Sequence, residues 1–157
     1  MSKSFISVQQ QDFDIKYESD QLRRDASNIG AMVTFTGLVR EIQQQEHSPQ
    51  QRQELFLEHY PGMTGKALQD IAVEAGRRWA IPCCRIIHRV GALQPGDQIV
   101  FVGTASTHRR DAFEAAEFIM DYLKTKAPFW KRQTDASGSE WVEHRDSDDM
   151  AAQRWIK

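Results

Sequence analysis

The sequence has 157 residues, which is enough for one domain with a substantial hydrophobic core, so we expect residues 1–157 to form a single domain. Its 20 basic and 22 acidic residues leave a formal charge of −2. This charge disfavours long-range attraction to a nucleic-acid backbone but is compatible with a local basic pocket. No apolar run approaches the length of a membrane span and no secretory leader is evident, so a cytoplasmic protein is expected.

The only two cysteines, Cys83 and Cys84, are adjacent in a predicted strand. Neighbouring residues of a strand point to opposite faces, so we expect no disulfide between them. The chain has no further cysteine that could complete a metal site with them. Free thiols of this kind fit a reducing compartment.

Hydrophobic periodicity and turn residues predict six strands and two helices. The strands are expected at residues 31–39, 54–60, 83–90, 98–105, 129–134 and 139–144. Thr64 is the predicted N-cap of the first helix, and the second runs from about residue 107 to 125. The positions expected to face the core are Leu68, Ile71, Ala72, Ala75 and Trp79 in the first helix, and Ala112, Ala115, Ala116, Ile119, Tyr122 and Leu123 in the second.

Three segments between these elements are predicted to be turns or loops. Gly91 to Gly96 form a turn, and Asp135 to Gly138 join the last two strands as a hairpin. Residues 41–53 are polar, rich in glutamine and contain a proline, which predicts a mobile loop.

From residue 54 to 134 the predicted order is strand, helix, strand, strand, helix, strand. This βαββαβ order is the split βαβ order of ferredoxin-like folds, here with extra strands before and after it. The predicted fold class is therefore α+β. The fold alone does not define a function, since this order occurs in enzymes, regulators and RNA-binding proteins.

The segment from Phe118 to Arg132 concentrates positive charge where a helix should end. Three lysines and an arginine lie around Pro128, which prevents the helix from continuing. Lysines in a last turn are favourable because they oppose the negative end of the helix dipole, which explains one or two of these cations. Lys131 lies beyond the helix and is not explained in this way. The cluster is either a solvated edge or an anion-binding, reactive site.

Two further basic positions are candidates for ligand binding. Arg40 directly follows a predicted strand, where it is either a solvated strand end or a pocket residue. His108, Arg109 and Arg110 lie at the start of the second helix, where free N–H groups and the dipole already favour an anion. Three basic residues are unfavourable there unless an anion or an acidic partner neutralises them. This mismatch predicts a phosphate or carboxylate ligand.

Other motifs of chemistry are missing from the sequence. The five histidines have no zinc-like spacing, and there is no Walker loop, dinucleotide fingerprint or Gly-x-Ser-x-Gly elbow. His59 and His88 are expected to be structural, the first orienting a strand end and the second hydrogen-bonded within a strand. Neither a metal nor a cofactor is predicted.

Five segments carry a resemblance to a known family: Val33–Arg40, Leu57–Met63, Ile87–Gly91, Pro95–Gly103 and Ala112–Arg132. Together, in this order and at these spacings, they resemble the large, catalytic subunit of molybdopterin synthase. The similarity extends from about residue 30 to the C-terminus. The first 28 residues and the loop at 41–53 are not informative for it.

The resemblance implies a fold described as an α/β hammerhead and a defined reaction. Members of this family convert cyclic pyranopterin monophosphate into molybdopterin by installing the two dithiolene sulfurs. The sulfur arrives as a thiocarboxylate on the C-terminal Gly-Gly tail of a small ubiquitin-like subunit. Two large subunits form a central dimer with one small subunit at each end. The chain is thus expected to be a sulfurtransferase of molybdenum cofactor biosynthesis.

The resemblance also implies roles for individual residues. Lys124 and Lys131 match the two essential lysines of the family, and Arg40 matches its strand-end arginine. His108 and Arg109 match a pair that the other large subunit contributes to the pocket. The remaining matches lie in substrate-contact stretches or near the pocket: Leu38, Val39, Arg132, Gln133 and Arg145. The chain departs from the family at Gln133, where relatives often have Glu, and in the longer loop at 41–53.

These residue types suit the implied chemistry. Arg40, His108 and Arg109 can hold a cyclic phosphate by charge-assisted hydrogen bonds. The thiocarboxylate is itself the nucleophile, so no active-site cysteine is required. Lys124 and Lys131 can stabilise developing anions and transfer a proton.

Two other classes of function remain open from the residues alone. One is a ferredoxin-like module that binds single-stranded nucleic acid through residues 129–132, which the net charge and the acidic residues at 143–149 disfavour. The other is an enzyme that forms a Schiff base through a lysine.

Overall fold

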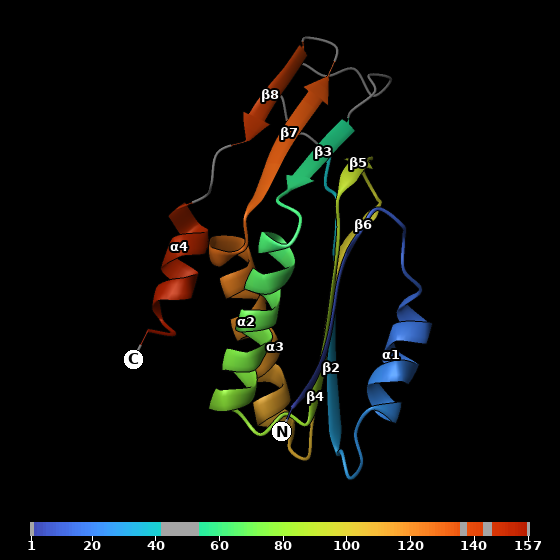
Figure 1. Ribbon diagram of the computed structural model, residues 1–157, viewed down its shortest axis with the longest axis vertical. Coiled ribbons are helices and arrows are strands. Elements are labelled where there is room, and N and C mark those ends of the chain that lie inside the picture. The colour runs from blue at the N-terminus through green and yellow to red at the C-terminus, as the bar shows by residue number, and fades with distance from the viewer. Residues whose placement is uncertain (1, 42–53, 136–137, 143–145, 157) are drawn as a thin grey trace.

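The computed structural model describes residues 2–41, 54–135, 138–142 and 146–156 (Figure 1). Its elements, in chain order, are β1 (Lys3–Gln9), α1 (Ile15–Arg24), β2 (Ala31–Leu38), β3 (Glu54–His59), α2 (Met63–Arg78), β4 (Cys83–Arg89), β5 (Gly91–Leu93), β6 (Gln98–Ser106), α3 (Arg109–Lys126), β7 (Phe129–Asp135), β8 (Gly138–Val142) and α4 (Asp146–Gln153). The predicted α+β class is confirmed, and so is the order of the elements between β3 and β7, with the short β5 added. The loop expected to be mobile, at 41–53, lies outside the described residues from residue 42 onward.

The strands form two separate four-stranded sheets. Sheet A has the order β1-β4-β6-β2 and sheet B the order β5-β3-β7-β8. The split βαβ unit is therefore divided, because β4 pairs with β6 in sheet A while β3 pairs with β7 in sheet B. In a ferredoxin-like fold these four strands would share one sheet. Sheet B lies beyond one end of the helices, at the top of Figure 1.

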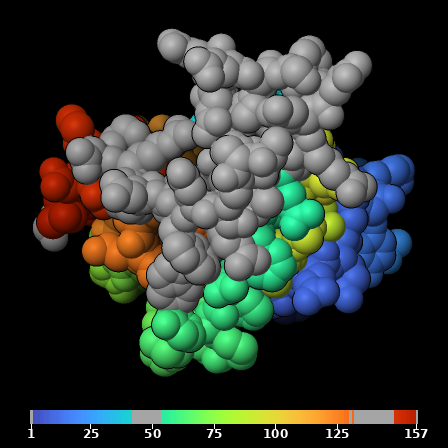
Figure 2. Space-filling model, turned by 90° about the horizontal axis from the view of Figure 1, so that it is seen from above, coloured from blue at the N-terminus to red at the C-terminus, as the bar shows by residue number. Residues whose placement is uncertain are grey.

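The helices cover both faces of sheet A. Helices α2 and α3 pack side by side on one face, and α1 lies on the other (Figure 1). Helix α4 packs on α3, and the view from the sheet B end shows α1 and α4 on opposite sides of the molecule (Figure 2). None of the helices in the described part of the chain is long and apolar enough to cross a membrane.

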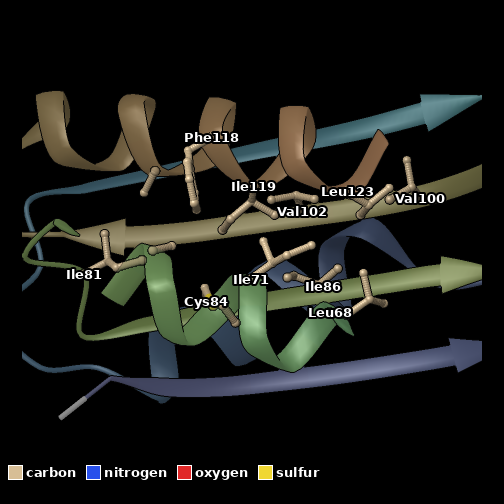
Figure 3. Close-up of a cluster of buried hydrophobic side chains, with 13 residues drawn as sticks. Leu68, Ile71, Ile81, Cys84, Ile86, Val100, Val102, Phe118, Ile119 and Leu123 are labelled. Atoms are coloured by element: carbon tan, nitrogen blue, oxygen red, sulfur yellow. The ribbon is translucent and has the colours of Figure 1, made fainter. Parts of the chain in front are cut away.

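The main core lies between sheet A and the pair α2 and α3 (Figure 3). Side chains of β4 alternate, so that Cys84 and Ile86 enter this core while Cys83 and Ile87 face α1. The predicted inward positions that are buried in it are Leu68, Ile71, Ala72, Ala75, Ala115, Ile119 and Leu123. Burying each large aliphatic side chain contributes roughly 1.5–3 kcal/mol, so this layer supplies much of the stability.

The start of α2 differs from the prediction. Gly62, with φ of 83°, occupies the N-cap position, and Thr64 lies inside the helix with its side chain fully buried. The Thr64 hydroxyl oxygen accepts a hydrogen bond from the Tyr60 N–H at 3.2 Å and donates one to the Pro128 carbonyl at 3.0 Å. The Thr64 side chain therefore ties the start of α2 to the end of α3 instead of capping its own helix.

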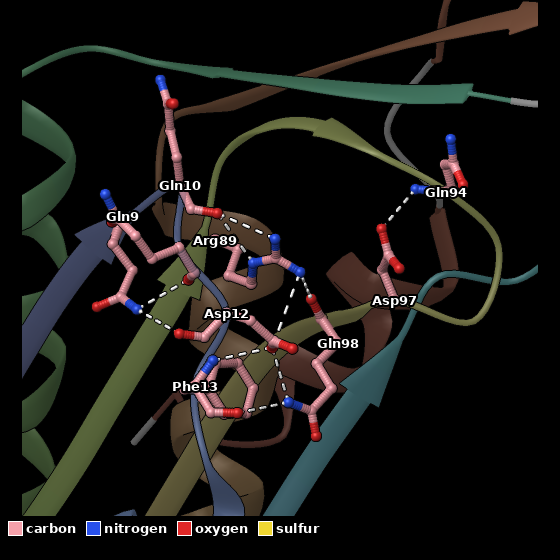
Figure 4. A network of polar contacts seen from close by, with 9 residues as sticks. Gln9, Gln10, Asp12, Phe13, Arg89, Gln94, Asp97 and Gln98 are labelled. Carbon is pink, nitrogen blue, oxygen red and sulfur yellow. Dashed lines mark hydrogen bonds and ion pairs between the residues drawn. The ribbon is translucent and has the colours of Figure 1, made fainter.

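The turn predicted at Gly91 to Gly96 is shorter than expected. Gly91–Leu93 forms β5, which pairs with β3. The turn itself follows, where the Asp97 N–H donates to the Gln94 carbonyl at 3.0 Å and the Asp97 carboxylate accepts from the Gln94 N–H at 2.9 Å (Figure 4). Gly91 and Gly96 have positive φ, at 90° and 93°, a backbone geometry that favours glycine.

Candidate active site

The junction between α3 and β7 presents the lysine cluster as the sequence predicts. Helix α3 ends at Lys126, Ala127 is extended with ψ of 129°, and β7 begins immediately after Pro128. Lys124 lies exposed in the last turn of α3, and Lys131 lies partly buried in β7. The two lysines thus lie on either side of the point where the chain leaves α3 and enters β7.

Lys131 lies on the inner face of sheet B. It is directly opposite Leu57 in the β3–β7 pair, and opposite residues of an antiparallel pair share a face. Leu57 is buried in a cluster with Val39, Val90 and Leu93, and Phe129 packs against the same cluster. Lys131 therefore borders an apolar layer on the side that faces sheet A.

Arg40 lies at this same end of the molecule. The preceding residue, Val39, packs with Leu57, and its N–H donates to the Asp97 carbonyl at 2.9 Å while its carbonyl accepts from the Gly96 N–H at 2.8 Å. These contacts fix the backbone, and Arg40 follows with an exposed side chain. Leu38, before the fixed residue, is 56% exposed.

A buried histidine, His88, lies beside the junction between α3 and β7. Its pKa is lowered to about 3, first by burial and then by the positive charges of Lys124, Lys131 and His59, against a backbone hydrogen bond that raises it. Phe129, which stacks on this imidazole, lies two residues before Lys131 in β7 and five residues after Lys124 at the end of α3, so the α3–β7 junction brings both lysines to the region of His88. The sequence interpretation of His88 as a hydrogen-bonded structural residue did not indicate this proximity.

His108 and Arg109 lie at the opposite end of α3 from Lys124. His108 is the N-cap residue, with no capping hydrogen bond from its side chain. At 1.5 Å per residue, the helix axis separates His108 from Lys124 by about 24 Å. One chain therefore does not bring these predicted site residues together.

The charge mismatch predicted at the start of α3 is partly relieved within the chain. Arg110 forms an ion pair with Glu114 at 3.0 Å. His108 and Arg109 are exposed, and the anion expected there stays a prediction.

Two of the remaining predicted site residues belong to β7. Arg132 and Gln133 are placed by their backbones in β7, opposite Phe56 and Leu55 of β3. Arg145 lies outside the described residues.

The two cysteines are buried, free thiols on opposite faces of β4, as expected. Burial raises the pKa of Cys83 to about 11 and that of Cys84 to about 12. The Cys83 thiol also donates to the Leu22 carbonyl at 3.2 Å. Both thiols are therefore protonated at neutral pH, and neither is activated as a nucleophile.

The described residues contain no group of three or more His, Cys, Asp or Glu arranged to hold a metal ion. A hollow of about 510 Å³ lies on the α1 side of sheet A and is lined by residues that include Lys3, Phe5, Tyr17 and Arg85. Neither Lys124 nor Lys131 lines it. Its buried cation, Arg85, is already held by Glu18 at 2.6 Å.

The fold and the site define a two-sheet α+β protein with a lysine-based candidate site and no activated thiol. The MoaE protein family model matches residues 8–126 of the chain. A molybdopterin synthase catalytic subunit from Pseudomonas aeruginosa is 53% identical over 150 residues, covering 96% of this chain and 97% of that protein. The chain belongs to the MoaE protein family, which confirms the resemblance identified in the sequence.

Solved structures agree with this membership. A MoaE protein from Burkholderia ambifaria superposes with a TM-score of 0.80 at 50% identity, covering 96% of this chain and 97% of that one. A molybdopterin synthase structure from Staphylococcus aureus gives a TM-score of 0.78 at 30% identity, covering 92% and 99%. The overall fold of the chain is therefore shared with known members of the family.

Proposed function

We propose that this chain is the catalytic subunit of a molybdopterin synthase and acts as a sulfurtransferase. The observation that carries the proposal is the placement of Lys124 and Lys131 on either side of Phe129, which stacks on the buried His88, in a member of the MoaE family whose two cysteines are buried. An enzyme that transfers sulfur without a thiol of its own needs a partner that supplies the sulfur. A small subunit with a C-terminal thiocarboxylate is such a partner.

In the proposed reaction the two lysines stabilise the negative charges that develop on the reacting groups. The thiocarboxylate sulfur attacks the carbon that bears one ester oxygen of the cyclic phosphate, so that a C–S bond forms as this C–O bond breaks and the phosphate stays attached through its other ester oxygen. The small subunit is then joined to the pterin as a thioester, and water cleaves the acyl–sulfur bond, which releases the small subunit as a carboxylate and leaves the sulfur on the pterin. A second thiocarboxylated small subunit adds its sulfur to the neighbouring carbonyl carbon, whose oxygen leaves as water, and a second hydrolysis releases that subunit. Lys124 and Lys131 stabilise the acyl oxyanion and the leaving phosphate oxygen, and one of them transfers a proton.

Arg40 and the stretches around it form the proposed pterin-binding part of the site. Arg40 extends from a backbone fixed by the turn before β6, next to the exposed Leu38 and the buried Val39. A guanidinium in this position can hold a phosphate with two parallel hydrogen bonds. Arg132, Gln133 and Arg145 are proposed to complete this part.

A second copy of the chain is proposed to supply His108 and Arg109. Within one chain they lie about 24 Å along α3 from Lys124. Strand β2 is the outer strand of sheet A, and Met32 and Phe35 on it are 36% and 42% exposed. An edge strand with exposed apolar side chains suits pairing with a second copy, as in the expected central dimer.

The proposal is tested by reconstitution. The chain is incubated with a thiocarboxylated small subunit and cyclic pyranopterin monophosphate, and the product is assayed as molybdopterin. Product formation supports the function, and its absence with an intact partner and substrate overturns it. Single-stranded RNA binding in the same preparation would favour the nucleic-acid-binding alternative.

Lys124→Ala provides the first test of the site. We expect it to abolish product formation while leaving the fold intact, because an exposed lysine in a last turn contributes well under about 1 kcal/mol of stability. Lys126→Ala is the matched control, since Lys126 lies in the same last turn and is also exposed. Equal activity of the two variants would show that Lys124 has no special role.

A further inference from the structure

His88 lies on the inward face of β4, where the preceding residues are apolar. Cys84 and Ile86 precede it on that face and enter the core beneath α2 and α3. Its neighbours across the sheet are Val8 on β1 and Val100 on β6, and the His88 side chain is only 5% exposed. A titratable ring therefore lies at the end of the hydrophobic core where sheet B begins.

Two contacts fix the orientation of the His88 ring. It stacks on Phe129, with ring centroids 3.9 Å apart and planes 21° apart. Its Nδ1 lies 2.8 Å from the Arg89 carbonyl oxygen. A carbonyl can only accept, so Nδ1 carries the proton and Nε2 keeps its lone pair.

Arg89, whose carbonyl selects this tautomer, is anchored through its own side chain. The Arg89 guanidinium donates to the Gln10 carbonyl at 3.1 and 3.0 Å and to the Gln98 carbonyl at 2.9 Å (Figure 4). These bonds tie the end of β4 to the end of β1 and the start of β6. The orientation of His88 is therefore set by the sheet, not by the lysines.

The charged groups that act on His88 come from three other elements. They are Lys124 from α3, Lys131 from β7 and His59 from β3. Burial and these charges both oppose a proton on Nε2, so the ring is neutral at physiological pH. Phe129, the ring that His88 stacks on, lies in sequence between the two lysines.

We propose that His88 is a positioning residue of the lysine site. Through Phe129 it holds the α3–β7 junction so that Lys124 and Lys131 face one substrate, and its Nε2 lone pair accepts a hydrogen bond from a lysine ammonium group in the assembled enzyme. A cationic side chain here would repel both lysines, and an apolar one would offer no acceptor. This inference rests on the proposed function for its catalytic consequence, but not for the state of the ring.

The state of the ring is tested on the wild-type chain alone by ¹⁵N NMR of labelled histidine. The proposal requires that His88 be the Nδ1–H tautomer and show no titration between about pH 8 and pH 5. A proton on Nε2, or a titration near neutral pH, overturns the inference whatever the chain catalyses.

The catalytic consequence is tested with His88→Phe, which keeps an aromatic ring to stack on Phe129 and removes the lone pair. We expect kcat to fall at least about tenfold with KM for the pterin nearly unchanged, because the effect is on the lysines and not on substrate contacts. The basic limb of the pH–rate profile should also move to lower pH, since an apolar neighbour stabilises a lysine ammonium less. Unchanged kcat and an unchanged profile would make His88 a packing residue only.

Two further variants keep this test decisive. Ile86→Val, two residues before His88 and on the same face of β4, perturbs the same core and should leave kcat and the pH profile as in the wild type. Phe129→Leu leaves His88 in place but removes the stacked ring, and it should lower kcat without moving the basic limb. If the wild-type chain makes no molybdopterin, the proposed function fails, while the NMR result still decides the tautomer.

Discussion

The ionisation of one side chain, His88, should be visible in the stability of the whole protein. Its folded pKa of about 3 lies below the usual histidine value of about 6.5. Below about pH 6.5 the histidine binds a proton in the unfolded state but stays neutral in the folded state. The contribution of the neutral ring to the free energy of unfolding is therefore fully present above about pH 6.5 and is lost as the pH falls towards about 3.

We expect the wild-type free energy of unfolding to fall between pH 6.5 and 5 by up to about 1.4 kcal/mol per pH unit more than that of His88→Phe. Urea titrations at several pH values measure this difference. The carboxylates with lowered pKa, such as Glu74 with a pKa of about 2, act at lower pH and do not obscure the window. Parallel curves for the two proteins would contradict the depressed pKa.

At the level of residues, the sequence indicated the basic side chains of the candidate site but not the contacts that hold the surrounding backbone in place. Lys131 stood out because no helix-capping role explained it, and Arg40 because it ended a strand. The link from Thr64 to the Pro128 carbonyl joins residues 64 positions apart, and local pattern cannot reveal it. The same holds for His88 and Phe129, whose stacking depends on how two sheets meet.

At the level of elements, α1 is joined to sheet A by a buried ion pair as well as by the buried Leu22 side chain. The Arg85 guanidinium on β4 donates from two nitrogens to one Glu18 oxygen, at 2.8 and 2.6 Å, and the two side chains are 7% and 10% exposed. Asp25, just after α1, lies 3.6 Å from the same guanidinium. Removing one member of such a pair leaves a buried charge without its partner.

We therefore expect Glu18→Gln to lower the free energy of unfolding by roughly 3 kcal/mol. A double variant, Glu18→Leu with Arg85→Met, should recover most of this loss because no unpaired charge remains. Lys16→Ala is the control on the same helix, where the exposed Lys16–Asp20 pair at 2.9 Å should contribute little. A negligible effect of Glu18→Gln, measured by urea unfolding, would show that Asp25 alone compensates the charge.

The strands rich in β-branched residues and both long helices were predictable because their periodicity is strong and local. Elements β1, α1 and α4 were not predicted. Helix α1 has a readable start, since the Asp14 carboxylate accepts from the Tyr17 N–H at 3.0 Å, but its first turns carry few apolar residues. Strand β1 is defined by its parallel pairing with β4, which lies far along the chain.

At the level of the whole molecule, the length of α3 makes a prediction about assembly. If His108 and Arg109 serve the pocket of a second copy, a mixture of Lys124→Ala and Arg109→Ala chains should regain activity. Each mixed dimer would contain one pocket with both defects and one with neither. Activity is measured after subunit exchange has been verified by mass spectrometry. No recovery in exchanged mixtures would mean that each pocket is built from one chain.

The division into two sheets could not be predicted from the order of elements, because order does not specify pairing. Strands β3 and β4 flank one helix, yet they belong to different sheets. After α3 the chain passes through Pro128 into β7, which pairs with β3 in sheet B. The cations were predictable at this junction, but the histidine beneath them was not.

The parallel pairing of β1 with β4 has a consequence for the newly made chain. Lys3 pairs with Cys83, so β1 finds its partner only after about 80 more residues have been added. At about 5–20 residues per second, β1 waits roughly 4–16 s with its hydrogen-bonding edge unsatisfied. Polar side chains at Ser4, Ser7 and Gln9 reduce the tendency of such a waiting strand to associate with other chains. The N-terminal segment is thus synthesised early and stabilised late.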